Sequence, residues 1–126
     1  MASASQILVV DDDELVAKMV GIMLRDVGEV TVAESGEAAE PMLGLREWDA
    51  IMIDIELPGI GGLELLEVVR RVRPEVGAVI LSSHRESAYA EVASRAGADD
   101  YLIKPVPPPD LQEKVRGLIA LTERRR

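Results

Sequence analysis

Short hydrophobic segments recur along the chain and alternate with longer segments of a different spacing. Five of them are predicted as β-strands: Ile7–Val10, the segment around Val30 and Val32, Ala50–Ile53, Ala78–Leu81 and Tyr101–Ile103. Most are continuous apolar runs, which is typical of strands buried on both faces, whereas Val30 and Val32 alternate with polar neighbours. The pattern therefore indicates a sheet that is covered on both sides.

Apolar residues at helical spacing follow each predicted strand. They mark a first helix from Leu15 to Met23, a third from Leu63 to Val72, a fourth from Ala88 to Ala96 and a fifth from Leu111 to Ile119. Ser35 is the predicted N-cap of a second helix that extends to about Leu45. Pro41 falls inside that helix and should kink or shorten it, because proline has no N–H to donate.

Strict alternation of five strands with five helices predicts an α/β fold with a parallel sheet. The expected architecture is a doubly wound (βα)5 flavodoxin-like sandwich with strand order 2-1-3-4-5. We expect residues 1–126 to form a single domain whose core spans about residues 5–123, because no linker, repeat or low-complexity segment interrupts the pattern. Ligands of such sheets bind beyond the carboxyl ends of the strands, so the residues after each strand carry the functional information.

Composition narrows the class of protein. The chain has no cysteine, which excludes disulfides and thiolate metal sites. Its net charge of -9 argues against direct binding to nucleic acid or to an anionic membrane. No segment is apolar for the length of a membrane span, and Met1–Ser5 is too short and polar for a signal peptide, so a cytoplasmic location is expected.

Polar residues that could take part in catalysis or binding follow four of the five strands. They are Asp11, Asp12 and Asp13 after the first strand, Asp54 after the third, Ser82 after the fourth and Lys104 after the fifth. Each alone has an ordinary explanation, such as a helix cap, a satisfied core hydroxyl or a solvated strand end. Their convergence at one edge of a parallel sheet favours a common site instead.

The chemistry open to such a site is narrow. Clustered carboxylates repel one another unless a cation lies between them, and an all-oxygen site suits Mg²⁺. Lys104 and Ser82 could contact the oxygens of a phosphoryl group. Asp54 would then be a nucleophile that forms an acyl phosphate.

Four segments carry a specific resemblance. ILVVDDDELV, DAIMIDIELPGIGGLELL, VILSSHR and AGADDYLIKPV resemble, in order, the four characteristic segments of the receiver domains of bacterial two-component response regulators. The resemblance covers essentially the whole chain. It implies a phosphoacceptor domain that catalyses its own phosphoryl transfer and dephosphorylation, and that is not a turnover enzyme.

The resemblance also implies a role for individual residues. Asp11 and Asp12 match the acidic pair, with Asp12 a direct Mg²⁺ ligand, and Asp54 matches the phosphoacceptor. Glu56 would give a backbone carbonyl to the metal. Ser82 matches the hydroxyl switch, Tyr101 the aromatic switch, and Lys104, before a usually cis bond to Pro105, the phosphate-contacting lysine. Asp13 lies outside the motif and is interpreted as a helix cap.

The implied partners are a histidine kinase or histidine phosphotransfer protein as phosphodonor, and a downstream effector or second copy as output. The output surface would comprise the fourth helix, fifth strand and fifth helix. Glu56 and His84 stand on the two loops expected to flank the phosphoryl group, so we expect them to tune its lifetime.

Two other functions stay open from the sequence. A Mg²⁺-dependent phosphohydrolase of the haloacid dehalogenase type also uses an aspartate nucleophile, but its DxD pattern follows the first strand, whereas Asp54-Ile55-Glu56 follows the third. A pseudo-receiver that is never phosphorylated is the other alternative, and the full set of Asp12, Asp54, Ser82 and Lys104 argues against it. The cognate kinase, the signal and the output are not encoded in these motifs, and the chain could be a single-domain regulator or a fragment of a larger one.

Overall fold

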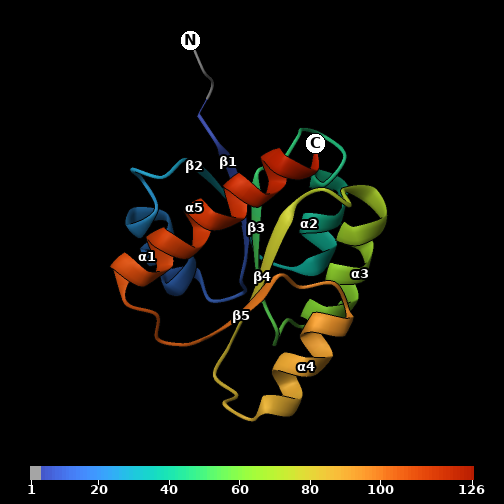
Figure 1. Cartoon of the computed structure of the whole chain (residues 1–126). Coiled ribbons are helices and arrows are strands. Elements are labelled where there is room, and N and C mark those ends of the chain that lie inside the picture. The colour runs from blue at the N-terminus through green and yellow to red at the C-terminus, as the bar shows by residue number, and fades with distance from the viewer. Residues whose placement is uncertain (1–3) are drawn as a thin grey trace.

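Strands and helices alternate strictly along the chain in a computed structural model, which describes residues 4–126 (Figure 1). The elements are β1 (Gln6–Val10), α1 (Glu14–Met23), β2 (Glu29–Ala33), α2 (Gly36–Met42), β3 (Ala50–Asp54), α3 (Gly62–Val72), β4 (Gly77–Ser82), α4 (Ser87–Arg95), β5 (Asp100–Ile103) and α5 (Pro108–Arg125). Every predicted strand and helix is present. The expectation that no signal peptide begins the chain falls partly on residues 1–3, which lie outside the described residues.

The five strands form one parallel sheet in the order β2-β1-β3-β4-β5, which confirms the predicted fold class. Val10 at the end of β1 pairs with Ala33 of β2 and with Ile53 of β3. The next residues, Asp11 and Asp54, are therefore level with each other on neighbouring strands. This register places the two acidic segments at the same edge of the sheet.

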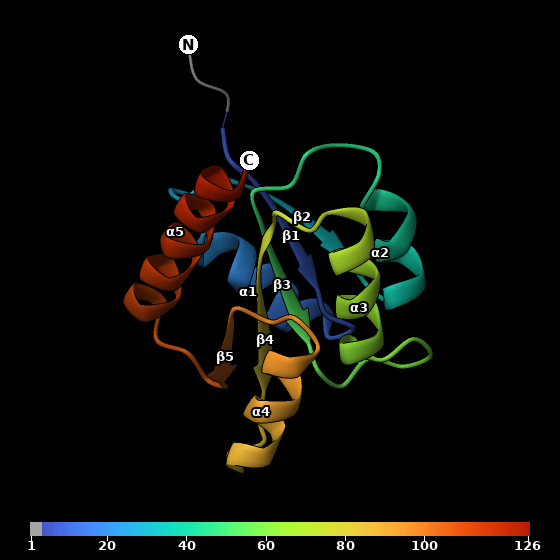
Figure 2. The same cartoon turned by 45° about the vertical axis from the view of Figure 1, so that its right-hand side comes forward.

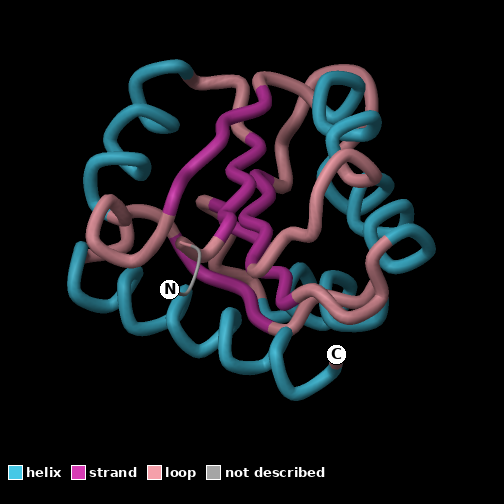
Figure 3. The backbone as a smooth tube through the Cα atoms, turned by 90° about the horizontal axis from the view of Figure 1, so that it is seen from above, coloured by secondary structure: helices cyan, strands magenta, loops and turns pink. Residues whose placement is uncertain are grey.

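Helices cover both faces of the sheet (Figures 2 and 3). One buried cluster joins α1 and α5 to the sheet through Val20, Leu24, Val115 and their neighbours. A second cluster lies against α2, α3 and α4 and includes Trp48, whose Nε1–H donates to the Met42 carbonyl at 2.9 Å. Trp48 apart, the largest fully buried side chains are those of isoleucine, leucine and methionine, as expected from a chain without phenylalanine. Within residues 4–126, no helix is both long enough and apolar enough to cross a membrane.

The second helix ends earlier than about Leu45. Ser35 is its N-cap, and the Ser35 Oγ accepts from the Ala38 amide at 3.0 Å. The helix stops at Met42, one residue after Pro41, and the Leu43 amide turns to the Glu40 carbonyl three residues back. Pro41 cannot donate to the Glu37 carbonyl, so this short helix lacks one of its few backbone hydrogen bonds.

Helices α1 and α4 bury only part of the apolar stripe that their spacing indicates. On α1 the buried residues are Ala17 and Val20, whereas Leu15 is 67% exposed and Met19 47% exposed. On α4 Ala93 is buried and Val92 is 48% exposed. In both helices the apolar stripe is wider than the strip that touches the sheet, so periodicity predicts the helix but not its contact line.

Thr122 of α5 anchors the amino-terminal ends of the strands, opposite the acidic segments at their carboxyl ends. Its buried Oγ1 accepts from the Gly77 amide at 2.7 Å and donates to the Asp49 carbonyl at 2.6 Å. Gly77 begins β4 and Asp49 precedes β3, so one hydroxyl joins two strand starts to a helix. A Cβ at Gly77 would lie 2.6 Å from the Leu118 carbonyl, which shows how closely α5 approaches the strand backbone.

Replacing Thr122 by valine is expected to lower the free energy of unfolding by about 1–3 kcal/mol, because the buried Gly77 amide loses its acceptor. Urea denaturation followed by Trp48 fluorescence measures the change. Thr122→Ser keeps the hydroxyl and should retain most of the stability. If the valine variant is as stable as the wild type, the hydroxyl does not hold this edge.

Candidate functional site

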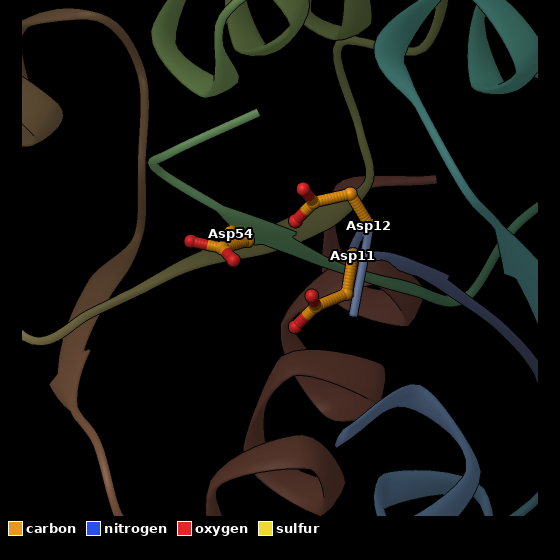
Figure 4. Close-up of side chains that lie close together, drawn as sticks. All are labelled: Asp11, Asp12 and Asp54. Carbon is orange, nitrogen blue, oxygen red and sulfur yellow. The ribbon is translucent and has the colours of Figure 1, made fainter. Parts of the chain in front are cut away.

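Three carboxylates gather where β1 and β3 end (Figure 4). Asp11 and Asp12 come from the segment after β1, and Asp54 is the last residue of β3. One oxygen from each lies within 4.8 Å of the others. Asp11 is 5% exposed, whereas Asp12 is exposed, so the cluster opens to solvent on one side.

The backbone around Asp54 fixes its carboxylate. The Glu56 amide donates to Asp54 Oδ1 at 3.0 Å, and the Ile55 amide extends the ladder to the Leu81 carbonyl at 3.0 Å. Helix α3 then begins at Gly62, where an added Cβ would lie 2.4 Å from the Asp54 carbonyl oxygen. Only glycine allows the helix to begin this close to the strand end.

Lys104 supplies the positive charge of the cluster. Its Nζ lies 3.1 Å from Asp54 Oδ2 and 3.4 Å from Asp11 Oδ2. Its amide donates to the Ser82 carbonyl at 2.8 Å, and the Lys104–Pro105 peptide bond is cis, as the resemblance implied. Burial disfavours the charged ammonium, but the hydrogen bond and charge of Asp54, with the charge of Asp11, raise the pKa of Lys104 above its ordinary value.

Asp11 and Asp13 have different environments. Burial raises the pKa of Asp11 above its usual value, although the Asp13 amide and Lys104 oppose the shift. Asp13 caps α1, and its Oδ1 accepts from the Leu15 and Val16 amides at 3.0 and 3.1 Å. The interpretation of Asp13 as a cap is confirmed, which separates it from the carboxylate cluster.

Ser82 and Tyr101 both contact the backbone of His84. The buried Ser82 Oγ accepts from the His84 amide at 2.9 Å, and the Tyr101 hydroxyl donates to the His84 carbonyl at 2.8 Å. The two residues expected to be switch positions are therefore linked through one residue of the β4–α4 loop.

Glu56 and His84 meet across the two loops that flank Asp54. His84 Nε2 lies 2.5 Å from Glu56 Oε1, with side-chain exposures of 34% and 63%. Sequence reasoning placed these residues near each other but missed Tyr89, whose ring stacks on the imidazole with centroids 4.2 Å apart and planes 6° apart. The signal available was its rarity, since Tyr89 is one of three aromatic residues in the chain.

The match to a family model identifies the class of protein. The model of the response regulator receiver domain matches residues 7–116, so the chain belongs to this family. It is similar to the receiver domain protein (CheY-like) of Methanospirillum hungatei, with 29% identity, a TM-score of 0.90 and coverage of 97% of this chain and 98% of that one. A putative response regulator from Chloroflexus aurantiacus is 35% identical with a TM-score of 0.88, covering 94% of this chain and 99% of that one.

Longer relatives share the same domain. The transcriptional regulatory protein AruR of Pseudomonas aeruginosa is 34% identical over 125 residues, which is 94% of this chain and 51% of AruR. The DNA-binding response regulator MtrA of Mycolicibacterium smegmatis is 34% identical over 120 residues, or 94% of this chain and 52% of MtrA. The chain thus spans about half the length of these relatives.

These findings decide some of the alternatives. The chain is a signalling domain of the receiver family, so the alternative of a haloacid dehalogenase-type hydrolase is not supported. The expectation of no direct contact with nucleic acid is not borne out, because net charge describes one domain whereas MtrA is a DNA-binding protein about twice as long. Three carboxylates with an open side are hard oxygen donors of the kind that Mg²⁺ takes.

Mg²⁺ is expected to stabilise the protein through this cluster. Binding to the native state alone adds about 1.4 kcal/mol when the free ion is at roughly ten times its Kd. Thermal melts with Mg²⁺ and with EDTA measure the effect. Asp12→Asn should lose most of the rise in Tm, whereas Asp26→Asn, the same change at an exposed position outside the cluster, should keep it. An equal Mg²⁺ response in both variants would place the ion elsewhere.

Proposed function

We propose that this receiver domain accepts a phosphoryl group on Asp54. The observation that carries the proposal is the position of the Asp54 carboxylate, in a cluster with Asp11 and Asp12 and 3.1 Å from Lys104 Nζ. A nucleophile, a cation and clustered hard ligands are the parts that phosphoryl transfer requires, because its catalysis consists mainly of positioning and charge stabilisation. Residues 1–126 would act together as one receiver domain.

The phosphodonor we propose is a phosphohistidine of a kinase or of a phosphotransfer protein. An oxygen of Asp54 attacks phosphorus, the new O–P bond forms as the N–P bond breaks, and the imidazole of the donor leaves with the electron pair. The Lys104 ammonium contacts a phosphoryl oxygen and offsets the negative charge that accumulates there. Asp11, Asp12, Asp54 and the Glu56 carbonyl would hold Mg²⁺, which supplies further charge neutralisation when bound.

Ser82 and Tyr101 would transmit the change. A phosphoryl group on Asp54 offers the Ser82 O–H a new acceptor, and a hydroxyl that turns toward it would weaken the bond that its oxygen now accepts from the His84 amide. Tyr101 holds the carbonyl of the same residue, so movement of the β4–α4 loop changes its contact. The surface formed by α4, β5 and α5 then shifts between two states that a partner can distinguish.

The output we propose is a change in binding at that surface, either to an effector or to a second copy of the chain. The relatives of this chain include a transcriptional regulatory protein and a DNA-binding response regulator, each about twice the length of the chain. The same switch would therefore suit control of a nucleic-acid-binding unit. We place the reaction in the cytoplasm, together with the phosphodonor domain.

The lifetime of the phosphorylated form would depend on Glu56 and His84. The acyl phosphate is lost when water attacks phosphorus in line and the Asp54 carboxylate leaves. The 2.5 Å contact between Glu56 and His84 joins the loops on either side of Asp54, and we propose that it narrows the path of that water.

Acetyl phosphate and Mg²⁺ should add one phosphoryl group to the protein, seen as a single mass increase by intact mass spectrometry. Asp54→Asn should abolish the increase while leaving the fold intact, because the amide is nearly the same size but is not a nucleophile. Labelling of this variant to the same extent would assign the phosphate to another residue. Absence of labelling in the wild type, with Mg²⁺ bound, would favour the pseudo-receiver.

His84→Ala should shorten the lifetime of the phosphorylated protein by roughly two- to fivefold, since an exposed pair contributes little more than that to a barrier. The decay of the phosphorylated mass with time gives the rate. Arg85→Ala is the matched control and should leave the decay unchanged, because Arg85 is the exposed neighbour of His84 on the same β4–α4 loop. Identical decay in His84→Ala and wild type would remove the contact from the mechanism.

A further inference from the structure

We infer that Tyr89 is a positioning residue for dephosphorylation, which acts by holding the imidazole of His84 against Glu56. The inference rests on the proposed function of Asp54 and extends it to helix α4. It follows from the number of fixed contacts around His84 and from the weakness of the Glu56–His84 contact taken alone.

The Glu56–His84 contact cannot hold itself in place. Both side chains are partly in solvent, with Glu56 63% exposed, and an exposed charged pair contributes little free energy to a fixed geometry. A long glutamate side chain also loses rotational freedom when it is held. The imidazole must therefore be oriented by something else if the contact is to persist.

Three neighbours orient His84, whereas the exposed Glu86 carboxylate, 3.9 Å from its Nδ1, lies beyond hydrogen-bond distance. Its amide and carbonyl are bonded to the Ser82 Oγ and the Tyr101 hydroxyl, which fix the backbone of the residue. These two bonds leave the side-chain torsions free. Tyr89 restrains the ring, because the two rings are nearly parallel with centroids 4.2 Å apart, and the imidazole packs against the face of the phenol.

The Tyr89 side chain is available for this role and is not needed by the core. It is 38% exposed and borders a hollow of 410 Å³ whose lining includes Ile55, Leu63 and Val92. The buried residue of α4 is Ala93. A substitution at Tyr89 therefore removes the ring contact without opening a cavity in the core.

The contact gives α4 a direct connection to the phosphoryl site. Asp54 Oδ1 accepts from the Glu56 amide, Glu56 Oε1 meets His84 Nε2, and the imidazole stacks on Tyr89 in the first turn of α4. A partner that shifts α4 would disturb the stack and alter the lifetime of the phosphoryl group. By reciprocity, a phosphoryl group that moves Glu56 would favour one position of α4.

The first test uses the unphosphorylated protein. His84 is the only histidine of the chain, so its imidazole C–H resonances are assigned without ambiguity. The Tyr89 ring should shift these resonances upfield. Tyr89→Leu should move them toward the values of a solvated imidazole, and Tyr89→Phe, which keeps the ring, should not. Unchanged resonances in Tyr89→Leu would overturn the inference whether or not Asp54 is phosphorylated.

The second test measures decay of the phosphorylated protein. Tyr89→Leu should quicken decay by up to roughly the two- to fivefold expected for His84→Ala, and Tyr89→Phe should decay like wild type. The double variant of His84→Ala and Tyr89→Leu should decay no faster than His84→Ala, because both changes remove the same contact. Glu91→Gln changes an exposed residue of α4 that does not line the hollow beside Tyr89 and should leave the rate unchanged.

Three outcomes of this test count against the inference: wild-type decay in Tyr89→Leu, additive effects in the double variant, or equal quickening in Glu91→Gln. Urea midpoints of all variants exclude a general loss of stability. Failure of acetyl phosphate to label Asp54 would refute the proposed function, and the resonance test would still decide whether Tyr89 orients the imidazole of His84.

Discussion

Repulsion among three carboxylates is the constraint around which this molecule is organised. Asp11, Asp12 and Asp54 are brought within 4.8 Å because β1 and β3 end level with each other in a parallel sheet. Lys104 and two backbone amides offset part of the repulsion, and burial still raises the pKa of Asp11. The site is therefore a place where added cationic or phosphoryl groups change the local balance of charge, which is what a switch requires.

Hydrogen bonds and ion pairs at the amino-terminal ends of the strands stabilise the fold. Arg70 contacts the Gly97 and Val76 carbonyls and pairs with Asp99 at 3.0 Å, and Arg125 of α5 also pairs with Asp99. Burial opposes the charge on Asp99, but Arg125, the Ala78 amide and Arg70 together hold its pKa below the usual range. With this network and the Thr122 hydroxyl anchoring the amino ends of the strands, the carboxyl edge can keep unfavourable charge without loss of the fold.

The loops at the carboxyl ends of the strands connect the carboxylate cluster to the surface formed by α4 and β5. Ser82, Tyr101 and Glu56 all contact His84, although they come from three different segments. One residue of the β4–α4 loop thus contacts the loop that follows Asp54, the buried hydroxyl of Ser82 and the tyrosine of β5. Small displacements at Asp54 can reach α4 and β5 through these contacts because each is a short, direct hydrogen bond, ion pair or ring contact.

The sequence pattern was enough to predict the strands, the helices, the order of the strands in a parallel sheet and the residues that follow each strand. Apolar periodicity identifies each short segment, and the alternation of these segments along the chain predicts the parallel topology. Asp11, Asp12, Asp54, Ser82 and Lys104 could be placed at one edge for this reason. The tertiary structure alone decided that α1 buries Val20 and leaves Leu15 exposed, that Thr122 reaches Gly77, and that Tyr89 lies flat on His84. Those contacts depend on how each helix is rotated over the sheet and how each loop is shaped, and packing among distant segments sets both.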